Sequence, residues 1–190
     1  MNAIDTRLKP KDWKPPLIAA VGMGTGPQCL GSLALEWINA AQILVGGDRH
    51  LELFPGHAGE KLSLRSPLSE SLEEIGRISE TKRIAVLCSG DPMFFGIGRT
   101  LAHRFGRERL VIVPNITSVQ ALCARICESL DKIDAVSFHG RKSETGIGRV
   151  LDSLARGRKV AVFTDPEHKP QWIAGELAKS PYSECKLTVG

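Results

Sequence analysis

Short apolar runs alternate with longer amphipathic segments along almost the whole chain. The apolar runs predict strands over residues 17–22, 43–46, 61–64, 83–88, 110–113, 135–138, 159–163 and 186–189, of which the run 61–64 is weak. The segments between them predict helices over residues 29–41, 71–80, 97–105, 145–156 and 170–178, with one more after Thr117. Strands separated by helices are typical of βαβ units, so the pattern predicts an α/β fold with mostly parallel sheets.

Capping residues and prolines indicate where helices start and where the chain divides. Ser71 with Glu74, and Thr117 with Gln120, have the spacing of a capping box, which predicts a helix start at each pair. Pro114 follows the fifth predicted strand, and we expect a domain boundary there. The expected parts are a basic, proline-containing leader over residues 1–16 that lies on the surface or is mobile, an N-terminal α/β domain over 17–114 and a C-terminal α/β domain over 115–190.

Composition narrows the class of protein without identifying its chemistry. The chain has 190 residues, 42% hydrophobic and 24% charged, which excludes disordered, collagen-like and coiled-coil proteins. A net charge of +4, evenly spread, argues against a nucleic-acid partner, and no apolar run approaches the roughly 18 residues of a membrane span. The five scattered cysteines indicate a reducing cytoplasm. Cys123 and Cys127 lie four apart with no further ligands, which favours plain thiols over half of a metal site, so no metal is expected.

A glycine-rich turn, from Gly22 to Pro27, follows the first predicted strand. Pro27 stands where a dinucleotide-binding loop needs glycine, and no Gly-Lys-Ser/Thr follows, so both common phosphate-binding loops are excluded. Two interpretations stay open. The turn only reverses the chain, or its bare backbone at Gly22, Gly24 and Gly26 lets a large flat ligand approach closely.

The segment from Ser89 to Gly98 is the most informative loop. It follows the carboxyl end of a strand, where open α/β sheets bind ligands, and it contains Asp91 before a proline as well as Phe94 and Phe95. Paired phenylalanines in a loop indicate an apolar ligand, and the alternative is a turn with core aromatics. Ser89 has no base partner at a motif spacing, and no catalytic residue is identified.

Cationic residues follow two other predicted strands. His139, Arg141 and Lys142 come after the sixth strand, and Arg49 and His50 come after the second. Arginine pairs bidentately with carboxylates, so these clusters suit a ligand with several carboxylates. Solvated loop charges are the alternative.

Taken together, several segments resemble the tetrapyrrole (class III) methylases, which use S-adenosylmethionine. The segments are residues 21–27, 45–51, 89–98, 114–120, 137–141 and 163–166. The glycine-Asp-Pro loop is typical of the whole family, whereas Gly-Gly-x-Arg-His-Leu and Ser-x-His-Gly-Arg indicate its carbon-5 branch. The resemblance implies two α/β domains with a cofactor cleft between them, and methyl transfer to carbon 5 of a precorrin or cobalt-precorrin in cobalamin synthesis.

The resemblance also implies roles for residues. The implied S-adenosylmethionine contacts are Gly90, Asp91, Phe94, Thr117, Ser118 and Thr164, and the implied substrate contacts are Gly22, Gly24, Gly26, Arg49, His139 and Arg141. A homodimer and a carbon-15 methyltransferase/decarboxylase partner module are implied as well. Asn115 replaces the family's usual glycine and tolerates a left-handed backbone. Relatives continue beyond the last residue, so we expect an incomplete second domain.

Two alternatives stay open. The chain is a methylase of the same fold that acts on another tetrapyrrole carbon, on RNA or on a protein, or it is a non-catalytic S-adenosylmethionine-binding or partner module. Methylation of candidate precorrins separates the first alternative from carbon-5 activity, and binding of adenosylhomocysteine separates the second.

Overall fold

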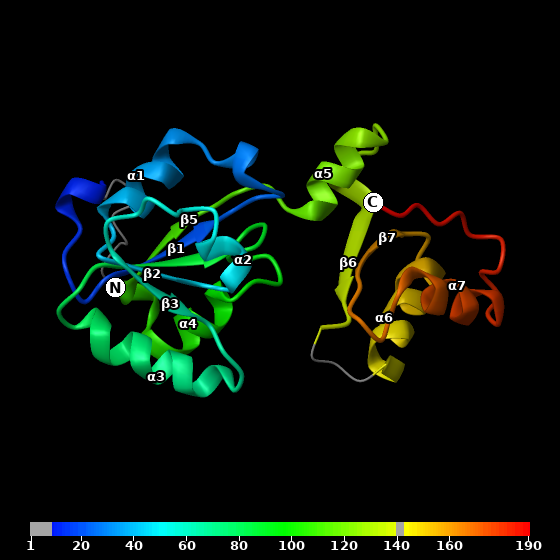
Figure 1. The fold of residues 1–190 in the computed structure, drawn as a ribbon. Helices are drawn as coiled ribbons and strands as arrows, with labels where there is room; N and C mark the ends of the chain where they lie inside the picture. Colours follow the sequence, from blue (N-terminus) through cyan, green and yellow to red (C-terminus); the bar gives the residue numbers. More distant parts are fainter. Residues whose placement is uncertain (1–8, 140–142) are drawn as a thin grey trace. The chain divides into compact units, whose positions relative to one another are not determined.

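Strands and helices alternate along the chain in the computed structural model, which describes residues 9–139 and 143–190. The chain divides into a first unit, Met1–Ser118, and a second unit, Val119–Gly190, which Figure 1 shows as ribbons. The first unit has a five-stranded sheet and the second a two-stranded sheet, and the strand pairs in both are parallel. The predicted α/β class is therefore confirmed. No helix in the described ranges is long and apolar enough to cross a membrane.

The first unit is a sheet with helices on both faces. Its strands are β1 (Ile18–Gly22), β2 (Ile43–Gly46), β3 (Glu60–Ser63), β4 (Ile84–Cys88) and β5 (Leu110–Val113), in the order β3-β2-β4-β1-β5. Its helices are α1 (Ser32–Ala40), α2 (Asp48–Leu51), α3 (Leu68–Ser79) and α4 (Gly98–Phe105), with 3-10 turns at Pro10–Asp12, Pro27–Cys29 and Arg107–Arg109. In Figure 1, α1 lies over one face of the sheet, and α3 and α4 lie over the other.

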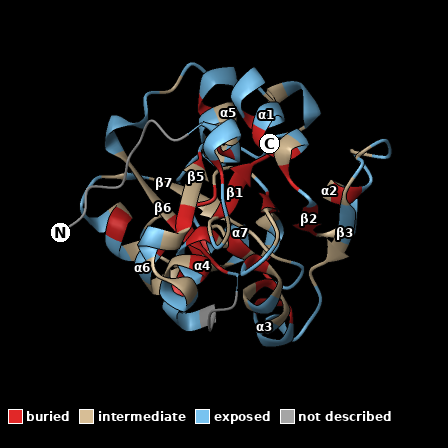
Figure 2. Cartoon of the chain, turned by 90° about the vertical axis from the view of Figure 1, so that its left-hand side faces the viewer, coloured by how far each residue is buried: buried red, intermediate tan, exposed pale blue. Residues whose placement is uncertain are grey.

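Successive residues of the central strands face two separate cores. Val21 of β1 packs in a cluster with Trp37 of α1, while Ile18 packs on the opposite face with Ile75 of α3 and Leu101 of α4. Every residue of β1 and of β4 is buried, and Figure 2 shows the buried colour on the central strands. Burial on both faces explains why these strands read as unbroken apolar runs.

The segment before β1 is anchored in the core. Trp13 is 2% exposed, its ring centroid lies 5.0 Å from that of Trp37, and its indole N–H donates to the carbonyl of Leu17 at 2.8 Å. The prediction that the whole leader lies on the surface or is mobile is therefore wrong for Trp13. Burial of this large aromatic side chain removes much apolar surface from water, which stabilises the fold more than an exposed position would.

Helix α3 begins three residues before the predicted capping box. It starts at Leu68, directly after Pro67, and the buried Ser71 hydroxyl accepts the N–H of Arg65 at 3.1 Å. The capping box of Ser71 and Glu74 is therefore wrong, because this serine caps the preceding loop and not the helix. Helix α1 likewise starts later than predicted, since a 3-10 turn and Gly31 come first.

The second unit is a parallel strand pair with helices packed against it. Its elements are α5 (Ser118–Arg125), a 3-10 turn at Leu130–Lys132, β6 (Ile133–Ser137), α6 (Ser143–Ala155), β7 (Lys159–Phe163) and α7 (Pro170–Ala178). Its core joins Val136 and Phe138 to Val150 of α6 and to Ile173 and Leu177 of α7. The strand predicted over residues 186–189 is wrong, because this segment pairs with no strand in the described part of the chain and its apolar side chains are exposed.

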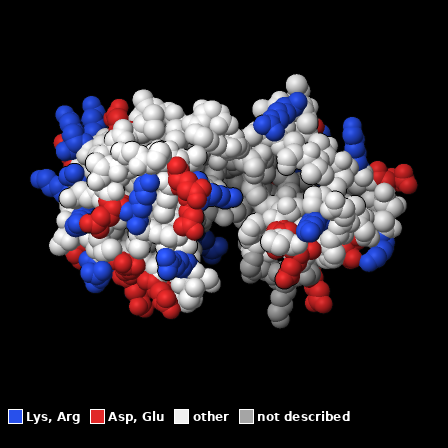
Figure 3. Space-filling view, in the orientation of Figure 1, with Lys and Arg blue, Asp and Glu red and all other residues white. Residues whose placement is uncertain are grey.

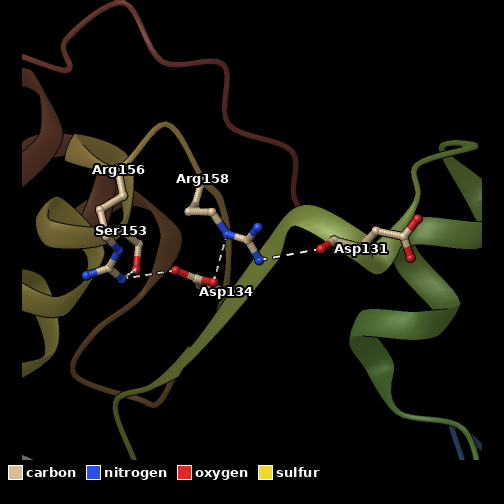
Figure 4. Close-up of polar contacts among 5 residues, drawn as sticks. All are labelled: Asp131, Asp134, Ser153, Arg156 and Arg158. Carbon is tan, nitrogen blue, oxygen red and sulfur yellow. Dashed lines mark hydrogen bonds and ion pairs between the residues drawn. The ribbon is translucent and has the colours of Figure 1, made fainter.

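An ion-pair cluster joins β6 to the end of α6 (Figure 4). Asp134 accepts hydrogen bonds from Arg156 at 3.2 Å and from Arg158 at 3.1 Å, and Arg158 reaches the carbonyl of Asp131 at 3.5 Å. Arg156 also donates to the hydroxyl of Ser153 at 3.2 Å. Hydrogen bonding with Ser153, Arg156 and Arg158 holds the pKa of Asp134 below its usual range.

We expect Trp13→Ala to lower the free energy of unfolding by about 3–5 kcal/mol, because it leaves a cavity beside Trp37. Trp13→Phe keeps most of the ring contact and is expected to cost less. Urea unfolding followed by circular dichroism measures both, with the exposed Lys11→Ala as a control that changes stability by less than about 0.5 kcal/mol. A Trp13→Ala protein as stable as the wild type would contradict the anchoring.

We expect Asp134→Asn to lower the melting temperature at pH 7, with a gap to the wild type that closes in acid. The unfolded carboxyl titrates near pH 3.9 and the folded one lower, so the stabilisation is complete above about pH 4 and disappears as the pH falls through the folded pKa. Calorimetric scans at pH 7 and pH 3 test this, with Asp152→Asn on the exposed face of α6 as control. A gap that persists unchanged at pH 3 would contradict it.

Candidate functional site

The loops that carry the predicted site residues of the first unit meet at one edge of its sheet. Parallel strands end on the same side, so the segments after β1, β2, β4 and β5 all emerge at the carboxyl edge. Open α/β sheets bind ligands at this edge. In the view of Figure 3, basic and acidic side chains intermingle over the first unit.

Glycines let the loops after β1 and β4 touch through their backbones. Gly24 and Gly90 form a two-way bridge, with N–H to carbonyl distances of 3.2 and 3.0 Å, and both have positive φ, 62° and 61°. A Cβ on Gly22 would lie 2.7 Å from the carbonyl oxygen of Gly90. This close approach by itself requires glycine at position 22, while the positive φ of Gly24 and a Cβ position 2.5 Å from Cβ of Cys29 require glycine at position 24. The substrate-binding role of Gly22, Gly24 and Gly26 stays a prediction.

The side chain of Asn115 ties the loop after β5 to the loop after β1. Its amide nitrogen donates to the carbonyl of Gly22 at 2.9 Å and to that of Cys29 at 3.0 Å, and its amide oxygen accepts the N–H of Ile116 at 2.8 Å. Asn115 does not have a positive φ, so its tolerance of a left-handed backbone is not used here. The Asn115 side chain instead contributes two amide N–H donors, which glycine lacks.

The Asp91 carboxylate supports the same junction. One oxygen accepts the N–H of Met93 at 2.7 Å, and the other accepts the N–H of Asn115 at 3.2 Å. The side chain of Asp91, in the loop after β4, is therefore bonded to the backbone of the loop after β5. This leaves the backbone of the loop, rather than the aspartate charge, as the group best suited to contact a cofactor.

Apolar side chains stand exposed around this junction. Met93, Phe94 and Phe95 are 52%, 39% and 44% exposed, and Ile116 in the next loop is 41% exposed. The two phenylalanine rings pack edge to face with centroids 5.0 Å apart. The alternative that these are core aromatics is therefore wrong. Clustered apolar exposure at a loop indicates a surface that a ligand covers.

Ser89 has a histidine partner that its sequence spacing hid. The Ser89 hydroxyl lies 3.2 Å from Nε2 of His50 and accepts a hydrogen bond from Nη2 of Arg49 at 2.7 Å. Burial, and then the charge of Arg49, lower the pKa of His50, so the imidazole is neutral at pH 7. The sequence spacing gave Ser89 no base partner, and the structure places an imidazole beside its hydroxyl. A signal existed, since Ser89 directly follows β4, His50 lies in the short helix after β2, and β2 and β4 are neighbours.

In the second unit, the predicted residues follow β6 and β7. Thr164 is half-buried and precedes Asp165, whose carboxylate accepts the N–H of His168 at 2.7 Å and contacts its ring Nδ1 at 2.8 Å. The buried His168 ring lies 4.8 Å from that of Phe138. The backbone N–H of His168 is the largest of several contacts that lower the pKa of Asp165. His139, after Phe138, is exposed.

The structure thus brings together part of the predicted set. Gly22, Gly24, Gly90 and Asp91 share one junction, and a Cβ on Gly90 would lie 3.7 Å from Cα of the buried Thr117. Ser118 is the first residue of α5, while Thr164 and His139 belong to the second unit. Arg141 and Lys142 lie outside the described residues. The binding roles of all these residues, and of Arg49 and Phe94, stay predictions.

Comparison with known proteins adds a family to this geometry. The model of the family "Tetrapyrrole (Corrin/Porphyrin) Methylases" matches residues 18–189. Cobalt-precorrin-7 C(5)-methyltransferase of Salmonella typhimurium is 40% identical over 175 residues, which span 92% of this chain and 84% of the relative. The precorrin-6Y C(5,15)-methyltransferase (decarboxylating) of Sinorhizobium is 34% identical, and the match covers 92% of this chain but 41% of that protein.

A solved structure shows the same architecture. The cobalamin biosynthesis precorrin-6Y methylase of Archaeoglobus fulgidus has a TM-score of 0.64 and 28% identity with this chain. The similarity covers 79% of this chain and 74% of that one. The expected likeness to this family is thereby confirmed in both sequence and fold.

We expect Asn115→Ala to lower the free energy of unfolding by about 1–3 kcal/mol, because two loop carbonyls lose their donors. Asn115→Asp is expected to cost more at pH 7, since a carboxylate donates to neither carbonyl and adds a charge near Asp91. Urea unfolding measures both variants against Asn39→Ala, an exposed control on α1. Wild-type stability of Asn115→Asp would show that the amide does not hold the loops.

Proposed function

The chain belongs to the tetrapyrrole (corrin/porphyrin) methylases, and we propose that it transfers a methyl group from S-adenosylmethionine to carbon 5 of a precorrin or cobalt-precorrin in cobalamin synthesis. The observation that carries this proposal is the 40% identity with the Salmonella carbon-5 enzyme across 84% of that enzyme's length. The relatives are named as methyltransferases, so the reaction class is methyl transfer.

The chain's own residues fit S-adenosylmethionine at the carboxyl edge of the first sheet. Exposed apolar side chains of Met93, Phe94 and Phe95 suit an adenosine ring and a thioether chain. Open backbone at Gly90 suits close contact, because a Cβ there would meet nothing nearer than 3.7 Å. We assign cofactor contacts to the backbone of this loop, including Asp91, and further contacts to Thr117, Ser118 and Thr164.

Positioning and exclusion of water are the tasks of the protein in this reaction. S-adenosylmethionine, when bound, supplies an electrophilic methyl group on a sulfonium, and the attacking carbon is supplied by the macrocycle. The loops fix the approach, and ordered reactants in a dry site remove much of the entropic part of the barrier. Arg49, His139 and Arg141 are proposed to contact the carboxylates of the macrocycle, and the turn at Gly22, Gly24 and Gly26 to lie along its face.

Several finer statements belong to the same proposal. The Sinorhizobium relative is named for carbons 5 and 15 and for decarboxylation, and we propose a carbon-15 methyltransferase/decarboxylase module as a functional partner of this chain. We also propose a homodimer in the cytoplasm, as the family resemblance implied. Size-exclusion chromatography with light scattering tests the oligomeric state.

We expect the purified protein to place one labelled methyl group on carbon 5 when incubated with S-adenosylmethionine, ¹³C-labelled in its methyl group, and cobalt-precorrin-7 or its metal-free counterpart. Nuclear magnetic resonance locates the label, and adenosylhomocysteine should appear in equal amount. Running both substrates decides whether cobalt is required. Label on a different carbon would favour the alternative of another tetrapyrrole position.

Two controls address the remaining alternatives. Label found only on added RNA or protein would overturn the tetrapyrrole substrate. Calorimetric titration with adenosylhomocysteine should show one site per chain. Absence of measurable binding would favour the non-catalytic partner module.

A further inference from the structure

Arg49, His50 and Ser89 form a hydrogen-bonded cluster, of which the proposed methyl transfer so far uses only Arg49. Arg49 and His50 lie in α2, after β2, and Ser89 directly follows β4, the strand beside β2. The cluster therefore lies at the same carboxyl edge as the loops described above. All three residues belong to the first unit, so their mutual distances need no other part of the chain.

The hydrogen-bond partners of the His50 ring determine which of its two nitrogens carries the proton. Nδ1 of His50 is buried and has no hydrogen-bond partner in the described part of the chain, while Nε2 lies 3.2 Å from the hydroxyl oxygen of Ser89. A buried N–H without an acceptor is rarer and costlier than a buried lone pair without a donor. The proton therefore resides on Nε2, and His50 donates to Ser89.

The Ser89 hydroxyl consequently turns its own proton outward. Its oxygen accepts from Arg49 at 2.7 Å and from His50, which together fill both lone pairs. The remaining group is the O–H donor, on an exposed residue. Arg49 is exposed as well, and one of its five N–H donors is engaged by Ser89. A cation and an outward hydroxyl donor side by side suit an anionic oxygen group.

The acidic groups near the cluster are already occupied. The Asp48 carboxylate, in α2, accepts the hydroxyl of Ser63 at 2.6 Å, and Asp91 accepts two backbone N–H groups. Among residues 9–139 and 143–190, no carboxylate forms an ion pair with Arg49. A charge-assisted hydrogen bond from a guanidinium is stronger than a neutral one, so an incoming carboxylate completes the cluster.

We propose that Arg49 and Ser89 bind one carboxylate side chain of the macrocyclic substrate, and that His50 is a positioning residue that keeps the Ser89 hydroxyl pointing at it. This inference rests on the proposed function, because that function supplies a substrate with several carboxylates. It adds Ser89 and His50 to the substrate contacts and gives each a hydrogen-bond role. The neutral state of His50 agrees with it, since an imidazolium would bury an N–H without an acceptor.

The test is an absorbance titration of the intact chain with cobalt-precorrin-7 in the presence of adenosylhomocysteine, which measures substrate affinity without turnover. We expect Ser89→Ala to raise Kd about 10-fold and Arg49→Met at least as much, the size of a lost hydrogen bond to a charged group. Ser89→Thr keeps the hydroxyl and should restore most of the affinity. The matched controls are Ser69→Ala and Arg77→Met, both exposed on α3, which should leave Kd unchanged.

His50 variants test its role as a positioning residue. His50→Leu is expected to weaken binding as much as Ser89→Ala, and the double variant should be no weaker than either single one. His50→Gln retains an N–H donor at the position of Nε2 and should recover affinity. Adenosylhomocysteine affinity, measured by calorimetry, should stay at the wild-type value in every variant, which a general loss of folding would not allow.

Other results would overturn the inference. An unchanged Kd in both Ser89→Ala and Arg49→Met would overturn it. A Ser89→Ala enzyme that loses kcat and the acidic limb of its pH profile at constant KM would also overturn it, because that behaviour identifies a proton relay. The inference also predicts that the wild type binds a methyl-esterified substrate more weakly than the free acid. The Arg49→Met variant should bind the ester and the free acid with similar affinity. Wild-type protein that binds no precorrin at all overturns the proposed function itself, and this inference with it.

Discussion

The parallel pairing of β1 between β4 and β5 is the constraint on which the rest of the first unit depends. It requires three chain segments, separated by crossovers with their own helices, to end at the same edge of one sheet. Buried apolar side chains on both faces hold the strands in register. Because each loop starts from a fixed strand end, the loops contact one another through their backbones although they form no regular secondary structure.

The loop junction shows how this constraint becomes a site. Gly24 and Gly90 exchange backbone hydrogen bonds, and the amide of Asn115 satisfies two carbonyls from the first loop. Polar backbone is thereby satisfied inside the junction, and apolar side chains such as Phe94 remain outside it, where a cofactor can cover them. The arrangement separates two tasks. Polar side chains hold the loops, and exposed backbone and aromatic surface are left for binding.

The Arg49–Ser89–His50 cluster extends the same logic to the substrate. Neighbouring strands place the three side chains within hydrogen-bond distance, and a histidine nitrogen without an acceptor decides the direction of the bonds. A serine that looks like a nucleophile beside a base is, by this accounting, an outward donor beside a cation. In the proposed function, carboxylate recognition and cofactor binding use different groups at one sheet edge, so variants of one need not disturb the other.

Local periodicity by itself determined the α/β class, the strands β1, β2, β4, β5 and β7, and the loops that follow those strands, because strand and helix periods are properties of neighbouring residues. Family motifs within those loops indicated the methylase family. Only the tertiary structure decided that Trp13 belongs to the core, that Ser71 serves a loop and that residues 186–189 have no strand to pair with. It also decided that Asn115 binds residues 93 and 86 positions away, and that Ser89 meets His50 across 39. Burial and satisfaction of single polar groups depend on partners remote in the sequence, and no local pattern carries that information.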